Sequence, residues 1–143
     1  MENDTTKLLT ECNSGIRMGV SAIDDVLGSV ENARLKNVLS RSRKKHEALE
    51  GETQKMLNKL GSVPQEPDRI VRGMAKVKTS FRLAVDGSDK TVAGLITDGC
   101  SMGVKSLSSY LNEYKKASDD AKDVAKRLIA LESCLSADLR SYL

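Results

Sequence analysis

Apolar residues recur every three or four positions through most of the chain, which is the spacing of one face of an α-helix. The first such stretch covers 4–27, and Gly28 after it suits the left-handed conformation that often ends a helix. The second stretch begins near Asn32, a residue type favoured as an N-cap, and continues to Leu60, where Gly61 stops it. The pattern therefore predicts a helical hairpin in the first part of the chain.

The rest of the chain has the same character. A helix over Asp68–Val85 is predicted after the only prolines, and Ser88 and Ser118 are predicted to cap two further helices that together reach Tyr142. No segment alternates apolar and polar residues as a half-buried strand does. We therefore expect an all-α fold in which 1–143 form a single domain.

A motif in the first predicted helix returns 84 residues later in the fourth. The identical positions are Gly15 and Gly99, Met18 and Met102, Gly19 and Gly103, Val20 and Val104, and Leu27 and Leu111. This internal repeat indicates two related hairpins, Asp4–Leu60 and Ser88–Tyr142, with Asp68–Val85 as the crossover helix between them. Two helical hairpins joined by a long crossover are the topology of ferritin-like, up-and-down helical bundles.

The repeated glycines lie four residues apart in the middle of predicted helices, where each costs about 1 kcal/mol relative to alanine. Residues four apart share one face of a helix, so each pair leaves a bare patch there. We expect Gly15, Gly19, Gly99 and Gly103 to serve helix packing. The first and fourth helices should approach most closely at Gly19 and Gly103, and Met18, Val20, Met102 and Val104 should pack beside that contact.

Composition narrows the function classes. The chain is 39% hydrophobic with a net charge of +3, which is ordinary for a helical bundle and too small a charge to indicate a nucleic-acid partner by itself. No apolar run approaches the ~18 residues of a membrane span, and the polar N-terminus is unlike a signal peptide. Cys12, Cys100 and Cys134 are far apart and odd in number, which favours buried free thiols in a reducing cytoplasm.

The chain also resembles a known family. The residues that carry the resemblance are Asn13-Ser-Gly-Ile16, Arg34-Leu-Lys-Asn-Val-Leu39, Leu60-Gly-Ser-Val-Pro64 and Asp98-Gly99. They are similar to small bacterial ferritin-like domains of unknown function, and the resemblance covers the chain from about Leu8 to the end. It implies a four-helix bundle of the ferritin-like superfamily.

The metal ligands of that superfamily are not retained. Its metal-bearing members hold two metals with a glutamate from each of two helices and a Glu-x-x-His motif from each of the other two. This chain has one histidine, His46, and Arg43 stands where the motif needs an acid. The central inward positions of the repeated helices, including Gly19 and Gly103, hold no carboxylate. The resemblance therefore implies a bundle without a dimetal site.

These observations predict a non-enzymatic, metal-free protein without a cofactor that acts as a structural or protein-interaction module, as a homodimer. We expect His46 to lie within hydrogen-bond reach of a carboxylate or a backbone carbonyl, with no metal. The alternative is a divergent metal-binding or redox protein that uses His46, Glu50 and Glu132, of which Glu50 lies one helical turn beyond the histidine.

A basic run, Arg41, Arg43, Lys44 and Lys45, lies on the second helix, and the predicted crossover helix adds Arg69, Arg72, Lys76, Lys78 and Arg82. Such surfaces can meet phosphates or an acidic partner. The chain has one phenylalanine and three tyrosines, so it offers little surface for stacking bases. A nucleic-acid partner is therefore the weakest of the three readings.

Overall fold

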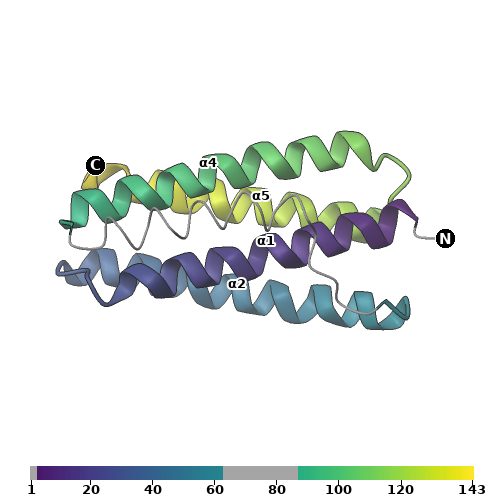
Figure 1. Cartoon of the computed structure of the whole chain (residues 1–143), viewed down its shortest axis with the longest axis horizontal. Coiled ribbons are helices and arrows are strands. Elements are labelled where there is room, and N and C mark those ends of the chain that lie inside the picture. The colour runs from purple at the N-terminus through teal and green to yellow at the C-terminus, as the bar shows by residue number, and fades with distance from the viewer. Residues whose placement is uncertain (1–2, 63–86) are drawn as a thin grey trace.

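Long α-helices packed side by side make up the structure, a computed structural model that describes residues 3–62 and 87–143 (Figure 1). The helices are α1 (Asp4–Leu27), α2 (Ala33–Lys59), α4 (Asp89–Glu113) and α5 (Asp119–Leu139), and a short 3₁₀ turn, η1 (Arg140–Tyr142), follows α5. The described residues contain no strand, so the all-α prediction is confirmed for them. The predicted crossover helix Asp68–Val85 and its basic residues lie outside the described residues.

Side-chain caps begin all four helices. The predicted N-caps Asn32, Ser88 and Ser118 each accept a hydrogen bond from a backbone N–H in the first turn of the helix that follows, and Asn3 does the same for α1. These bonds satisfy N–H groups that have no partner within the helix.

The two predicted helix stops behave differently. Gly61 has a φ of +69°, in the left-handed region that glycine allows, as expected for a residue that follows a helix. Gly28 has a φ of −66° and stays right-handed, so the prediction of a left-handed cap there was wrong. At this end of α1 the N–H groups of Gly28 and Ser29 both donate to the carbonyl of Val26, a tightened last turn that needs no left-handed residue.

Each helical hairpin is fastened at its loop by the first turn of the other hairpin. The carboxylate of Asp89, the first residue of α4, accepts hydrogen bonds from the N–H groups of Glu31 and Asn32 in the α1–α2 loop. At the opposite end, Asp4, the first residue of α1, accepts from the N–H of Lys116 in the α4–α5 loop. As a result, α2 and α4 begin at the same end of the bundle, and α1 begins at the end where α4 gives way to α5 (Figure 1).

The helices are not equivalent neighbours. The most extensive contacts are those within the two hairpins, α1 with α2 and α4 with α5. Helices α1 and α5 also contact each other. In addition α1 contacts α4, and α5 contacts α2, whereas α2 and α4 lie at opposite corners of the bundle (Figure 1). Among the described residues, no helix is long and apolar enough to cross a membrane.

Two apolar clusters fill the inside of the bundle, one towards each end. The first includes Leu8, Ile16, Leu49, Leu107 and Leu128, and the second includes Ile23, Leu39, Ile96, Leu135 and Leu139. Along every helix the two sets are separated by a short gap in the apolar pattern. The four gaps lie at the same level of the bundle, and the candidate site lies there.

Candidate functional site

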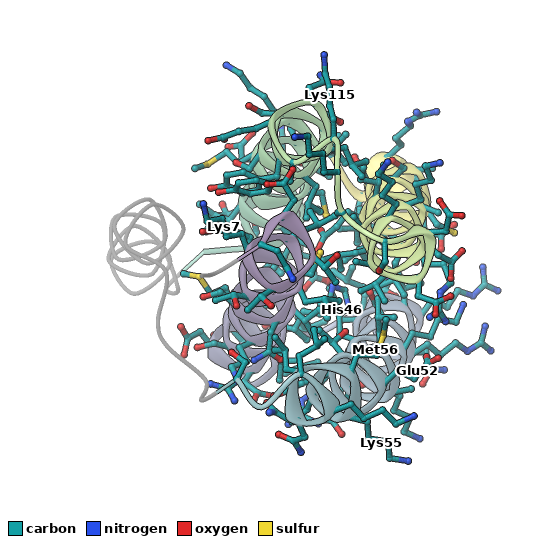
Figure 2. The ribbon with its side chains drawn as sticks, turned by 90° about the vertical axis from the view of Figure 1, so that its right-hand side faces the viewer. Lys7, His46, Glu52, Lys55, Met56 and Lys115 are labelled. Carbon is teal, nitrogen blue, oxygen red and sulfur yellow. The ribbon has the colours of Figure 1, made fainter. Side chains whose placement is uncertain are left out.

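The gap between the two apolar clusters is a polar layer. It is formed by one residue from each helix: Gly19 of α1, His46 of α2, Gly103 of α4 and Glu132 of α5. The side chain of His46 points into the space between the helices, whereas Lys7, Lys55 and Lys115 point outward (Figure 2). His46 is fully buried and Glu132 is 8% exposed, so solvent reaches the carboxyl group only marginally and the imidazole not at all.

Both ring nitrogens of His46 have partners. Nδ1 lies 2.7 Å from the backbone carbonyl oxygen of Ser42, and Nε2 lies 2.9 Å from Oε1 of Glu132. The prediction that this histidine lies within reach of a carboxylate or a carbonyl is confirmed, since it reaches both. Two other polar side chains on the inward face of α2, those of Ser42 and Thr53, are buried as well. The Thr53 hydroxyl donates a hydrogen bond to the carbonyl of Leu49.

The geometry fixes the hydrogen on one ring nitrogen of His46 and requires a proton between the other nitrogen and Glu132. A carbonyl oxygen only accepts, so Nδ1 carries a hydrogen and donates it to Ser42. Nε2 then needs one proton on the line to Glu132, carried either by the imidazole or by the carboxyl group. In both arrangements the two groups satisfy each other, which removes the cost of about 1–3 kcal/mol for burying an unpaired polar group.

The glycines make room for this pair. A Cβ at Gly19 would lie 2.9 Å from both Cδ2 and Nε2 of His46 and 3.5 Å from Oε1 of Glu132. A Cβ at Gly103 would lie 3.8 Å from Cγ and Cδ of Glu132. The nearest atoms at both glycines therefore belong to side chains of α2 and α5.

This finding corrects the packing prediction for the repeated glycines. Gly19 and Gly103 face a buried side-chain pair, not each other's backbone, because α2 and α5 fill the centre of the bundle. A Cβ at Gly99 would meet no atom of residues 3–62 or 87–143 within 4 Å, and Met102 is 45% exposed, so neither belongs to a tight contact between the described helices. Gly15, Met18, Val20 and Val104 are partly buried, and Met18 packs against the first apolar cluster.

Cys100 borders the polar layer from α4. Burial raises the pKa of its thiol far above the usual range, and the charge of Glu132, to which the thiol donates a hydrogen bond, raises it further. A thiol in this state is neutral, and the thiolate is the form that acts as a nucleophile or a metal ligand. Cys100 therefore contributes a hydrogen-bond donor to the layer and no reactive sulfur.

The other two cysteines differ from each other. Cys12 is buried in the first apolar cluster, where burial, with the charge of Glu11 as a lesser cause, raises its pKa to about 12. Cys134 is exposed, so the prediction that all three thiols are buried was wrong for this one. Helix α5 turns Cys134 to solvent because its buried positions are the neighbouring Glu132 and Leu135.

Glu50 does not join the other two candidate metal ligands. Its carboxylate receives a hydrogen bond from Arg17 of α1 at 3.1 Å, on the surface of the bundle. The structure thus brings together His46 and Glu132 and leaves Glu50 outside. Within residues 3–62 and 87–143, no group of three or more histidine, cysteine, aspartate or glutamate residues is arranged to hold a metal ion.

The predicted basic run divides into two parts. Arg43 turns toward α1 and binds Asp24 and Glu47. Arg41, Lys44 and Lys45 are exposed and form no ion pair with a described residue. The run therefore contributes three uncompensated positive charges to the outer face of α2.

The spacing of apolar residues does not predict the contact that Glu132 makes in the polar layer. Glu132 was expected beside His46 and Glu50 as a candidate metal ligand, but neither Gly19 nor Gly103 was expected to make room for the His46 and Glu132 side chains. The available signal was the coincidence of a glycine in one repeat copy, a glycine in the other and a polar residue on each remaining helix.

Comparisons with protein-family models, with curated proteins and with solved structures found no match for the chain.

Proposed function

We propose that this chain is a non-enzymatic, metal-free bundle of ferritin-like topology that acts in the cytoplasm as a structural or protein-interaction module. The observation that carries the proposal is the closed His46–Glu132 pair. Both ring nitrogens of the only histidine are engaged by protein groups, and the imidazole is fully buried. A metal or a substrate would have to displace these bonds and find further ligands in a layer whose other residues are two glycines and Cys100, the thiol of which is neutral.

The chemistry of the interior supports the same proposal. General acid–base catalysis needs a titrating group within reach of a substrate proton, and nucleophilic catalysis needs an activated thiol or hydroxyl. His46 is fully buried, and the raised pKa of Cys100 keeps that thiol neutral. The described interior is therefore suited to holding the helices in place and offers no reactive group to solvent.

The places where the helices begin and end along the bundle support the ferritin-like topology and the internal repeat. Helix α2 ends at the end of the bundle opposite to that at which α4 begins, so the hairpins are not joined by a short turn. Ferritin-like folds share this feature. The reciprocal fastening of each loop by Asp4 or Asp89 is what two copies of one hairpin design, related by a twofold axis, would produce.

Metal analysis tests this proposal. The protein is purified without chelator, and iron, manganese and zinc are quantified per chain alongside a His46→Gln variant. We expect far less than one equivalent of any of these metals, and no difference between the two proteins. About two equivalents of iron or manganese, as in the dimetal members of the superfamily, with loss in the variant, would refute the metal-free role.

The proposed interaction role includes self-association of the chain as a homodimer. Sedimentation velocity over a range of protein concentrations measures it directly. A concentration-independent monomer would restrict the interaction role to other proteins.

A further inference from the structure

The outer face of α2 carries a line of basic side chains. Its members, which we call the α2 basic stripe, are Arg34, Arg41, Lys44, Lys45, Lys55 and Lys59, and all six are exposed. Their separations are close to multiples of the helical repeat, so they share the side of α2 that faces away from the bundle. At 1.5 Å per residue the stripe extends over about 37 Å, and Lys55 can be seen pointing outward from it (Figure 2).

These side chains have no ion-pair partner among the described residues. Lys55 has a charge interaction with Glu52 that is weaker than that of Arg127. Glu52 is the acidic residue among them, and both its oxygens accept hydrogen bonds from Arg127 of α5, at 3.0 and 3.1 Å. By contrast, Arg17 and Arg43, at the border between α1 and α2, are paired with acids. The fold neutralises the basic residues beside the stripe and leaves the stripe itself positive.

Small residues interrupt the middle of the stripe. Ala48 and Gly51 lie on the same side of α2 and are exposed. A Cβ at Gly51 would meet no atom of residues 3–62 or 87–143 within 4 Å, so packing among these residues does not require a glycine in this helix interior, where glycine is unfavourable. A close approach by the backbone of another molecule would require one.

We propose that the α2 basic stripe docks an acidic helical segment of a partner protein. The straight row of cations complements carboxylates at helical spacing on a second helix, and Ala48 and Gly51 let the two backbones approach. A nucleic acid fits less well, because the stripe has no aromatic residue on which a base could stack and the chain has a net charge of only +3. This proposal rests on the interaction role proposed above and specifies the chemical class of the partner.

Binding of two polyanions tests the proposal, with fluorescently labelled poly-L-glutamate as the acidic polypeptide and a short DNA duplex as the competing class. The stripe variant carries Arg41→Gln, Lys44→Gln, Lys45→Gln and Lys55→Gln. The control variant, with the same change in net charge on exposed positions of the other helices and loops, carries Lys7→Gln, Lys105→Gln, Lys115→Gln and Lys126→Gln. A third variant, Gly51→Leu, fills the gap in the stripe without changing any charge.

We expect the wild type to bind poly-L-glutamate at low ionic strength and to prefer it to the duplex. The stripe variant should bind about tenfold more weakly or worse, and the control variant should stay within about twofold of the wild type, because local charge outweighs net charge at contact distances. Gly51→Leu should also weaken binding.

Three results would overturn the proposal: equal losses in the stripe and control variants, tighter binding of DNA than of poly-L-glutamate, or no binding of poly-L-glutamate by the wild type at low ionic strength. Circular dichroism of each variant establishes that it is folded. Metal content measured on the same wild-type sample tests the metal-free role separately, so a failure of that role and a failure of the stripe are distinguishable.

Discussion

The imidazole of His46 on α2 and the carboxyl group of Glu132 on α5 lie 2.9 Å apart in a layer to which α1 contributes Gly19 and α4 contributes Gly103 and the Cys100 thiol. The two residues are far apart in the sequence and on different hairpins, so their bond joins the two halves of the bundle. A shift of α2 along α5 by one turn would bury both groups without partners, at about 1–3 kcal/mol each. The pair therefore favours a single alignment of the two helices.

The two glycines of the layer should respond differently to alanine. A Cβ at Gly19 would lie 2.9 Å from the His46 ring, which is held by two hydrogen bonds and cannot move without stretching one of them. We expect Gly19→Ala to lower the free energy of unfolding by about 1–3 kcal/mol. Gly103→Ala makes only an ordinary contact and should raise it, by up to about 1 kcal/mol, through helix propensity. Urea denaturation of both variants measures the contrast, and equal stabilities would contradict this account of the layer.

Removing one partner of the buried pair should cost more than removing both. We expect His46→Leu and Glu132→Leu each to lower the free energy of unfolding by about 3 kcal/mol, because each leaves a buried polar group unpaired. The double variant should lose clearly less than the sum, since apolar residues of similar size can replace a buried pair at little cost. Denaturant unfolding of all four proteins completes the cycle. Additive losses would mean that the two side chains do not depend on each other.

The buried Cys12 thiol should cause a specific loss of folding stability at high pH. Burial raises its pKa from 9.0 to about 12 in the folded protein, so between these pH values the unfolded chain loses a proton that the folded chain keeps. The contribution of Cys12 is therefore complete below pH 9 and falls as the pH rises toward 12, by up to about 1.4 kcal/mol per pH unit. The difference in unfolding free energy between the wild type and Cys12→Ala, measured from pH 7 to 10.5, should be constant at first and then shrink. A constant difference across the whole range would contradict the buried thiol.

The Asp89 carboxylate should protect the α1–α2 loop. It accepts hydrogen bonds from the N–H groups of Glu31 and Asn32, at 2.9 and 3.0 Å. We expect Asp89→Ala to lower the free energy of unfolding by about 1 kcal/mol and to speed hydrogen exchange at these two amides. Asp98→Ala is the matched control, because Asp98 is exposed on the same helix and forms no hydrogen bond with a described residue. Unchanged exchange at Glu31 and Asn32 in Asp89→Ala would show that the bonds do not hold the loop.

Most of the described fold could be predicted from local signals. The spacing of apolar residues predicted the bounds of α1, and the caps Asn32, Ser88 and Ser118 were identified because their side chains act within one turn of the helix they begin. Gly28 was misjudged because α1 ends in a tightened turn, in which the N–H groups of Gly28 and Ser29 both donate to the carbonyl of Val26. The hydrogen bonds from Glu31 and Asn32 to Asp89, which belongs to another helix, are not local and do not appear in the periodicity.

The candidate site could be predicted only in part, for the same reason. His46 lies among the apolar positions of α2, which indicated that its buried ring needs a polar partner. The repeated glycines indicated that space is left on α1 and α4. Which side chain enters that space depends on the rotation of α2 and α5, which periodicity does not determine to within one residue. That rotation places Glu132 against His46 and turns Glu50 toward Arg17.

The most direct test of the central claim is nitrogen-15 NMR of the single imidazole, recorded before and after addition of one equivalent of zinc or iron(II). If His46 belongs to a closed structural pair, Nδ1 carries a hydrogen bonded to Ser42, and the signals of both ring nitrogens stay unchanged when metal is added. A stoichiometric shift or loss of the Nε2 signal on addition of metal would mean that Glu132 and His46 open to bind it, and would contradict a metal-free structural role.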